Sequence, residues 1–470
     1  MTDFTQYQSP FSWRYGSQEM RSIWSEIHKR QLWRRTWIAL ASVQQSYGLV
    51  SQEQLAELEA HAGQVDLPRA LEIEAEIHHD LMAELKTFAE QCPAAGGILH
   101  MGATSMDIED NVDALRLGEG LVLVLQRLSS LLSVLADQID QTADLPVIAF
   151  THLQPAEPTT LGYRLACYTQ DLLEDWQVLS GMRAMLRGKG FKGAVGTGAA
   201  YADLLGLHNF AAFEESLSRE LNLPFYPVST QTYPRKQDYQ VIGALAGLGA
   251  SLHKLAFDLR LLQSPPVGEL SEPFSSHQVG SSAMPFKRNP INAEKIDSLA
   301  RLLAALPEVA WHNAANSLLE RTLDDSANRR SILPEAFLIV DELLITAQRI
   351  IKDLKINREA IQRNLDTYAP FAATERVLMA AARGGADRQE MHERLREHAM
   401  AAWQEIQAGR PNPLIENLKS DTWIATYLSP EQIESLANVA AYTGIAPQRA
   451  RETAERVRLE LGGRPSSALS

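Results

Sequence analysis

Residues 280–290 read G-S-S-A-M-P-F-K-R-N-P and gather side chains that could hold an anionic molecule and react with it. One glycine and two prolines in this run suit neither a helix interior nor a central strand, so we predict a loop. Pro285 and Pro290 stiffen its backbone, so the loop can aim polar side chains at a ligand. Those side chains are Ser281, Ser282, Lys287 and Asn289. An anionic substrate is the ligand that we expect, and a polar surface linker is the competing interpretation.

A second cluster, residues 321–330, reads R-T-L-D-D-S-A-N-R-R and concentrates three arginines, a serine and an asparagine in an acidic protein. Guanidinium groups match the oxygens of phosphate and carboxylate, so this segment is a candidate anion clamp. The alternative is a helix start in which Asp324, Asp325 and the arginines pair among themselves. Residues 231–236, Q-T-Y-P-R-K, allow two interpretations as well, ligand contacts or a polar turn.

His152 is the candidate proton-transfer residue. It lies in residues 150–156, F-T-H-L-Q-P-A, which form a short break between two long helical patterns. An imidazole at the end of a helix can reach into a cleft, and its unperturbed pKa near ~6.5 lets it give or take a proton at neutral pH. The alternative is an ordinary surface histidine in a loop.

Three patterns give no support for a dinucleotide or metal site. Residues 188–193 spell G-x-G-x-x-G, but they end a helical pattern instead of following a strand, as a dinucleotide site requires. Residues 392–398 lack the i, i+4 histidine pair of a zinc helix. His78 and His79 would point about 100° apart on a helix, so they cannot both face one ion.

The composition limits the possible partners. The chain of 470 residues carries a net charge of -14, which argues against nucleic acid or an anionic membrane, because a polyanion needs a basic face. The two cysteines suggest neither a disulfide framework nor a C-x-x-C site, and the first ten residues lack a secretory signal, so a cytoplasmic location fits. The most apolar stretch, residues 121–135, is shorter than the ~20 residues of a bilayer-spanning helix.

Helical periodicity dominates the elements that must position these side chains. We predict an all-α fold with an N-terminal helical domain (1–110), a central bundle of long helices (111–364) and a smaller C-terminal helical domain (365–470). The long patterns cover residues 111–142, 158–187, 236–263, 292–314 and 334–354. Further helical patterns are expected at residues 17–47, 51–62, 70–91, 358–365, 373–383, 388–408, 430–440 and 447–461, and short strands at 146–150 and 225–228. Residues 115–135 are apolar around much of the helix, which indicates burial in an oligomer.

The motifs together resemble the adenylosuccinate lyase family, a branch of the fumarase/aspartase superfamily whose members eliminate fumarate from succinyl compounds. The loop at 280–290 is similar to the signature loop of the superfamily. The arginine-rich segment and two early motifs favour this family over fumarase, aspartase or argininosuccinate lyase. The resemblance runs from about residue 13 to about residue 396 and rests on the segments 13–15, 79–80, 100–105, 151–155, 231–233, 280–290 and 320–330.

The resemblance implies a fumarase/aspartase-like fold of three helical domains, in a homotetramer whose active sites are each built from three chains. It also implies two reactions of purine synthesis. One converts adenylosuccinate to AMP and fumarate, and the other releases fumarate from the succinylated aminoimidazole carboxamide ribotide. No cofactor or metal is required for either reaction.

By resemblance, Ser281 is the base that removes a proton from carbon, and His152 is the acid that protonates the leaving nitrogen. Lys287 and loop amides would stabilise the serine alkoxide, and Glu294 would orient and charge the histidine. The implied substrate contacts are Arg14, Tyr15, His79, Asp80, Thr104, Ser105, Gln231, Asn289, Lys295, Arg321, Ser326 and Arg330. Two positions depart from relatives: Lys295 stands where some carry Arg, which replaces a bidentate contact with a point charge, and Phe286 where many have His or Tyr.

Two other functions compete with this interpretation. The chain could be a different lyase of the superfamily, such as argininosuccinate lyase or a carboxymuconate cycloisomerase. It could also be a catalytically silent helical scaffold. The presence of Ser281, Lys287, Asn289, His152 and Glu294 speaks against a silent scaffold.

Overall fold

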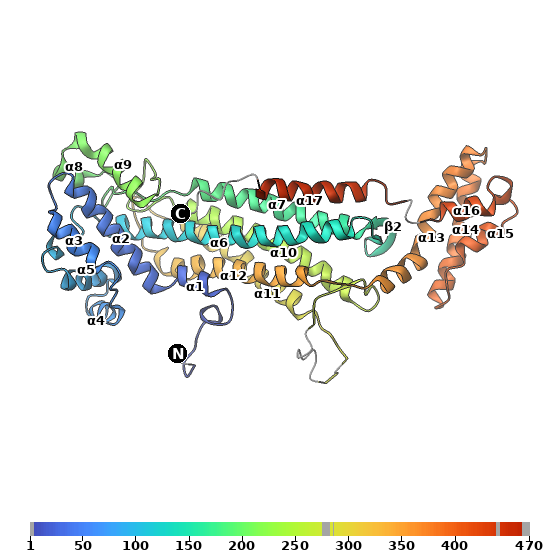
Figure 1. Cartoon of the computed structure of the whole chain (residues 1–470), viewed down its shortest axis with the longest axis horizontal. Helices are drawn as coiled ribbons and strands as arrows, with labels where there is room; N and C mark the ends of the chain where they lie inside the picture. The colour runs from blue at the N-terminus through green and yellow to red at the C-terminus, as the bar shows by residue number, and fades with distance from the viewer. Residues whose placement is uncertain (1–3, 275–282, 285, 439–441, 463–470) are drawn as a thin grey trace. The chain divides into compact units, whose positions relative to one another are not determined.

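The computed structural model describes residues 4–274, 283–284, 286–438 and 442–462 and is mainly helical there, with very little sheet (Figure 1). Its only sheets among the described residues are two short antiparallel pairs. The predicted all-α class is therefore confirmed. The predicted strand at 146–150 corresponds to β1, whereas the one at 225–228 contributes only an isolated bridge between Gly188 and Phe225.

The chain groups into two compact units, each assembled from segments that are distant in sequence. Unit 1 comprises Met1–Leu128, Asp175–Ala250 and Ser298–Ile345, and unit 2 comprises Ser129–Glu174, Ser251–Asp297 and Thr346–Ser470. The predicted domains divide the sequence at 110/111 and 364/365, and that division stays a prediction.

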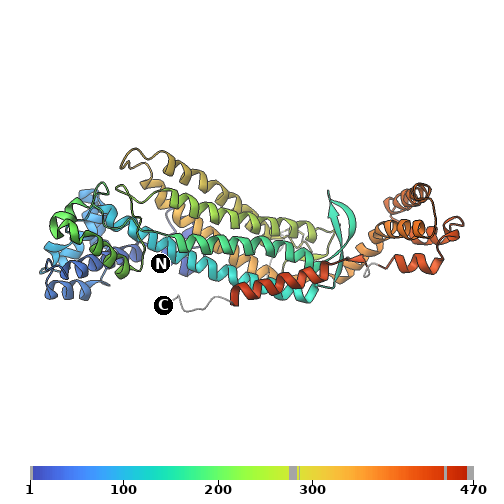
Figure 2. The same ribbon diagram turned by 90° about the horizontal axis from the view of Figure 1, so that it is seen from above.

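Five long helices contribute residues to both units. They are α6 (Ser105–Thr142), α7 (Leu161–Met185), α10 (Lys236–Gln263), α11 (Ile291–Ala315) and α12 (Ser326–Lys352) (Figures 1 and 2). Their leucines recur at helical spacing and most of them are buried, as the sequence predicts. In unit 1, α6 packs closely on α12, because a Cβ added at Gly120 would lie 2.7 Å from the Phe337 ring. The long predicted helices are therefore confirmed, but some of their bounds differ. Helix α6 begins at Ser105 instead of 111, α7 at Leu161 instead of 158, and α12 at Ser326 instead of 334.

Helix α6 is longer than the apolar stretch at residues 121–135, which by itself is too short to span a membrane. It contains an 18-residue window with a mean hydropathy of 1.5, so by length and composition it could cross a membrane. A core helix of a folded protein passes the same test, and seven of the leucine, valine and alanine side chains of α6 between 121 and 136 are buried. The absence of a membrane partner stays a prediction.

Unit 1 also contains the shorter helices α1 (Gln18–Ile23), α2 (Glu26–Gln45), α3 (Gln52–His61), α4 (Leu67–Ile77), α5 (Asp80–Gln91), α8 (Ala199–Leu205) and α9 (Phe210–Leu221). Ser17, Ser25 and Ser51 cap the first three through their hydroxyls. These helices enclose an apolar core that includes Trp37, Phe88, Tyr201, Phe213 and Tyr233.

The predicted helix over 70–91 is interrupted. His78 has a left-handed backbone (φ 55°), which ends α4, and His79 is the N-cap of α5. A left-handed non-glycine residue has no reliable signature in a sequence, so periodicity alone predicted one helix instead of two.

Unit 2 contains a β-hairpin, β1 (Pro146–Thr151) and β2 (Gln154–Thr160), and a second pair, β3 (Leu270–Ser271) and β4 (Lys355–Ile356). Helix α13 (Arg358–Arg383) packs against both hairpin strands. It is one helix with Pro370 inside it, where the sequence predicts two. The remaining helices are α14 (Arg388–Gln407), α15 (Leu414–Ser420), α16 (Pro430–Leu436) and α17 (Ala446–Gly462).

Candidate active site

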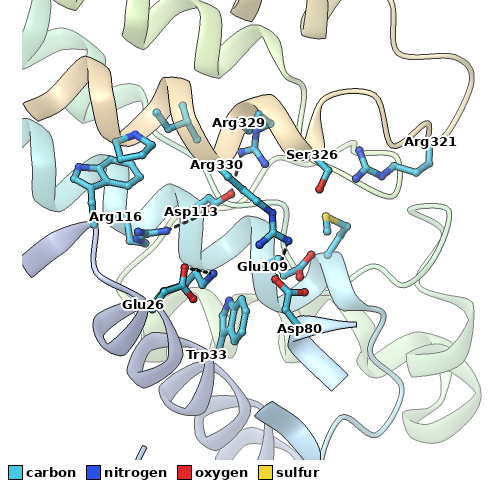
Figure 3. A pocket seen from close by; sticks show the side chains of 15 residues that line it. Glu26, Trp33, Asp80, Glu109, Asp113, Arg116, Arg321, Ser326, Arg329 and Arg330 are labelled. Atoms are coloured by element: carbon cyan, nitrogen blue, oxygen red, sulfur yellow. Dashed lines mark hydrogen bonds and ion pairs between the residues drawn. The ribbon is translucent and has the colours of Figure 1, made fainter. Parts of the chain in front are cut away.

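A pocket in unit 1 brings together residues from α2, α5, α6 and α12 with the loop that precedes α12 (Figure 3). Four predicted substrate contacts line it: Asp80, Arg321, Ser326 and Arg330. The first two are 241 positions apart in sequence, so no local pattern joins them. The other lining residues are Trp24, Glu26, Lys29, Trp33, Met106, Glu109, Asp113, Arg116, Arg329, Leu333 and Pro334.

Arg330 crosses the pocket from α12, and its Nη2 donates to Asp80 Oδ2 at 2.8 Å (Figure 3). Burial alone would raise the pKa of Asp80, but the positive charge and hydrogen bond of Arg330 outweigh it and hold that pKa below its usual value. The Arg330 side chain is 56% exposed, so its guanidinium is accessible to a ligand.

Ser326 is the first residue of α12, where the helix dipole favours an anion, and its own N–H donates to the carbonyl of Leu323 at 3.0 Å. Arg321, five residues earlier, donates to Asp325 Oδ1 at 2.7 Å. Arg321 therefore pairs within the arginine-rich segment, as the alternative interpretation of that segment predicts, whereas Arg330 pairs with a residue of another helix. The pocket still presents both guanidinium groups beside a helix N-terminus.

A buried network that the sequence did not predict holds the start of α12. Arg235 donates to Asp110 Oδ1 at 3.0 Å and to Asp325 Oδ2 at 2.5 Å. Arg329 donates to Asp238 Oδ2 and to the Tyr233 hydroxyl, both at 2.8 Å. Arg329 therefore serves the structure, although it lies in the predicted anion clamp. The part of the sequence that could have indicated this network is the turn T-Y-P-R-K, residues 232–236, but the same residues are equally consistent with ligand contacts.

Glu109 is a second pocket residue that sequence reasoning missed. Burial raises its pKa to about 8, and the negative charges of Asp80, Asp113 and Asp110 act in the same direction. Arg330 opposes this effect, but it does not cancel it. At neutral pH this carboxyl is mainly protonated and can donate a hydrogen bond into the pocket.

Three predicted contacts meet where α6 begins. His79 Nε2 lies 3.3 Å from the Ser105 hydroxyl, while its Nδ1 accepts from the Met82 N–H. Thr104 N–H donates to Asp107 Oδ2 at 3.0 Å, which caps α6. The structure thus places His79, Thr104 and Ser105 together in unit 1.

The remaining predicted contacts of unit 1 lie in loops. Gln231 N–H donates to the carbonyl of Glu320 at 3.2 Å, which puts Gln231 next to the arginine-rich segment. The exposed Arg14 guanidinium stacks on the Trp13 ring, 4.5 Å from its centroid. The neighbouring Tyr15 ring lies 5.9 Å from Phe11.

His152, the predicted general acid, belongs to unit 2. His152 is exposed at the tip of the hairpin, between β1 and β2, and not simply in a loop between two helices. Ser281 lies outside the described residues. Lys287 is exposed, and its N–H donates to the carbonyl of Met284 at 3.0 Å.

Glu294 and Lys295 lie near the start of α11, three and four residues after Ile291, and the backbone carbonyl of Asn289 accepts the Ile291 N–H at 2.9 Å. The buried Glu272 accepts from the N–H groups of Asn292 and Ala293, both at 3.1 Å. A carboxylate at this helix start is favourable and fixes the end of the predicted loop. Among the described residues, no group of three or more His, Cys, Asp or Glu side chains could hold a metal ion.

Comparisons with known proteins agree with this architecture. The model of a family described as "Lyase" matches residues 19–303, and one described as "Adenylosuccinate lyase C-terminus" matches residues 370–453. Adenylosuccinate lyase of Schistosoma mansoni is 40% identical, with 90% of both chains covered. Adenylosuccinate lyase of Saccharomyces cerevisiae is 38% identical, with 97% of this chain and 95% of the relative covered.

Solved structures of similar fold include 3-carboxy-cis,cis-muconate lactonizing enzyme from Pseudomonas putida (TM-score 0.85, 25% identity, 97% and 100% coverage). A fumarate lyase from Mesorhizobium sp. BNC1 is similar as well (TM-score 0.82, 25% identity, 98% and 100% coverage). The fold and the first family model define an enzyme of the fumarase/aspartase-type lyases. Within that class, the chain belongs to the adenylosuccinate lyase family, because the curated relatives match nearly its whole length.

Proposed function

We propose that this chain eliminates fumarate from adenylosuccinate, giving AMP, and from the succinylated aminoimidazole carboxamide ribotide, giving the carboxamide. The observation that carries the proposal is the identity of 38–40% with two adenylosuccinate lyases over at least 90% of the chain. The pocket of unit 1 supports it, because it offers two arginines and a helix N-terminus to an anionic substrate.

In the proposed mechanism, Ser281 removes a proton from the carbon beside a succinyl carboxylate. The electron pair of that C–H bond is first held in a dianionic aci-carboxylate and then forms the C=C bond of fumarate as the C–N bond breaks. His152 gives its proton to the departing nitrogen, so both products leave with complete valences. A serine hydroxyl is a weak base, and Lys287 would stabilise its alkoxide.

The substrate phosphate would bind at the start of α12, against Ser326, Arg321 and Arg330. Charge-assisted hydrogen bonds from guanidinium to phosphate are stronger than neutral ones. In a chain with a net charge of -14, such a local cationic site is what an anionic nucleotide requires. The phosphate would compete with Asp80 for the exposed Arg330 guanidinium.

We also propose a cytoplasmic homotetramer whose active sites combine residues of three chains, without nucleic acid or a membrane as partner. Exposed large apolar side chains support burial between subunits. On the long helices of the described chain they are Tyr163, Val178 and Met185 of α7, Tyr239, Phe257 and Leu261 of α10, and Ile291, Leu302 and Trp311 of α11. Residues 115–135 of α6, in contrast, are covered within the chain or partly covered, apart from polar positions.

The direct test is an absorbance assay of nucleotide substrates with the purified protein. Adenylosuccinate and the succinylated ribotide should both be converted to fumarate and the corresponding nucleotide. A second candidate comes from the fold, since the solved neighbours include a lactonizing enzyme of a carboxymuconate. Turnover of argininosuccinate or a carboxymuconate, with neither nucleotide converted, would replace the proposal. No turnover of any of these would indicate a silent scaffold.

A further inference from the structure

The hairpin that carries His152 has a tip whose backbone is unfavourable. Both turn residues, His152 (φ 53°) and Leu153 (φ 58°), are left-handed, a conformation that two-residue hairpin turns usually give to asparagine and glycine. Between the pairs Ile148–Pro158 and Phe150–Pro155, β1 advances two residues and β2 advances three, so β2 carries a bulge. Such a tip keeps one geometry only where the surrounding structure holds it.

Arg164, in the first turn of α7, holds the hairpin at this bulge. Its Nη2 donates to the carbonyl oxygen of Ile148 at 2.7 Å, and its Nη1 donates to Glu269 Oε2 at 3.1 Å. The side chains of Arg164 and Glu269 are 14% and 1% exposed, so this ion pair is largely removed from water. One guanidinium therefore joins the hairpin backbone to a second segment of unit 2.

Glu269 is itself fixed by α13 and the strand pair β3–β4. Its Oε1 accepts from the Asn364 amide at 3.0 Å, and its backbone carbonyl accepts from the Asn357 N–H at 2.9 Å. Asn364 also donates to the carbonyl of Val267 at 3.0 Å. The carboxylate of Glu269 thus has a hydrogen-bond partner on each oxygen. Because Glu269 is held in place, it in turn fixes the position of the Arg164 guanidinium.

The same segment leads directly into the predicted catalytic loop. Leu270 and Ser271 form β3, and Glu272 then accepts from the backbone at the start of α11, the helix that carries Glu294. The Arg164–Glu269 pair therefore connects the His152 hairpin with the stem of the segment that contains Ser281 in sequence.

We propose that Arg164 and Glu269 are positioning residues for the reaction, which fix the His152 hairpin at its bulge so that the imidazole keeps its place as general acid. This inference rests on the proposed function, because it requires His152 to be the proton donor. Neither residue reaches the substrate in this account, so each should affect turnover and not substrate binding.

The test is a double-mutant cycle between Arg164→Gln and His152→Ala, with kcat and KM measured for adenylosuccinate. A misplacement of about 1 Å can cost ~10²-fold in rate, so Arg164→Gln should lower kcat by at least about 10-fold with KM within about 2-fold. Because Arg164 acts through the imidazole, adding Arg164→Gln to His152→Ala should lower kcat by less than about 2-fold further.

Arg164→Gln leaves the buried Glu269 charge without its cation and could prevent folding. The variant Arg164→Gln/Glu269→Gln removes both charges, and it should fold and show the same loss in kcat. Arg451→Gln is the matched control, because Arg451 pairs with Asp144 on the surface of the same unit. Its kcat should equal that of the wild type.

The outcomes separate the inference from the proposed function. If His152→Ala lowers kcat, but Arg164→Gln lowers kcat by the same factor in the His152→Ala protein as in the wild type, His152 keeps its role and the positioning inference is wrong. A rise in KM with unchanged kcat would also overturn the inference. If His152→Ala retains the wild-type kcat, the proposed role of His152 fails, and the inference fails with it.

Discussion

Replacing Glu109 with glutamine should make the protein more stable above neutral pH. The carboxyl lines the pocket of unit 1 beside Asp80 and Asp113, and burial raises its pKa from 4.5 to about 8. Because the pKa in the folded state exceeds the unfolded value, the folded state binds the proton more tightly. The stabilisation from this proton is complete below about pH 4.5 and is lost as the pH rises through about 8.

The size of the effect follows from this shift. Each unit of difference between folded and unfolded pKa is worth about 1.4 kcal/mol, so the free energy of unfolding should fall by up to about 1.4 kcal/mol per pH unit between about pH 5 and 8. The full range sets a limit of about 4 kcal/mol at pH 8. We expect ~2 kcal/mol, because the Arg330 guanidinium and solvent can rearrange around the ionised carboxylate.

Glutamine has nearly the same shape as protonated glutamate and does not ionise. At pH 8 the Glu109→Gln protein should therefore have a free energy of unfolding about 2 kcal/mol above that of the wild type, and the two should be close at pH 5. Urea unfolding at both pH values, at one fixed protein concentration, measures this difference. Glu215→Gln, at an exposed position on α9, is the control and should unfold like the wild type at both pH values.

The reasoning would be refuted if wild type and Glu109→Gln lost stability in parallel between pH 5 and 8. Such a result would mean that the carboxyl is ionised throughout this range. The pocket would then hold four ionised carboxylates, those of Glu26, Asp80, Glu109 and Asp113. Its net positive charge, which would attract an anionic substrate, would be smaller.

Three further predictions concern catalysis. His152→Ala and Ser281→Ala should each lower kcat by ~10² to 10⁴ and leave the oligomer folded, and a near wild-type kcat in either would remove that residue from its role. Mixing these two inactive proteins should restore some activity after subunit exchange, and no recovery despite demonstrated exchange would place each site within one chain. Arg321→Leu or Arg330→Leu should each raise KM for nucleotide substrates by about ten-fold to more than a hundred-fold, since a charge-assisted contact contributes roughly 1.5 to 3 kcal/mol. The loss should be smaller for a dephosphorylated analogue, and an equal loss of kcat/KM for both would assign the arginines to folding or to the succinyl carboxylates.

Periodicity and motif order predicted much of this protein because they depend on near neighbours. Leucines three and four positions apart define a helix whatever it packs against, so the five long helices follow from the sequence. The order of residues in segments such as 100–105, 280–290 and 321–330 was sufficient to indicate the family, which the curated relatives confirm. Serine caps at Ser17, Ser25 and Ser51 are equally local.

Local patterns failed where the backbone adopts an uncommon conformation. The break at His78 and the hairpin tip at His152 both need a left-handed backbone without glycine, which a sequence does not reveal. The sequence also did not predict β2, because this strand contains prolines at 155 and 158. Proline has no N–H to donate to a neighbouring strand and is usually excluded from strands. The sequence predicted a helix beginning at 158 for this reason.

The choice of partners for charged side chains is what only the tertiary structure decided. Within the arginine-rich segment, Arg321 pairs with a neighbour, Arg329 is buried against Asp238, and Arg330 reaches Asp80, 250 positions away. The three guanidinium groups are chemically identical, so the sequence determines that this segment is cationic and that it starts a helix. Which of them remains accessible to a ligand depends on burial and on the acids that other helices bring within about 3 Å, because an ion pair is strong only at short range and out of water.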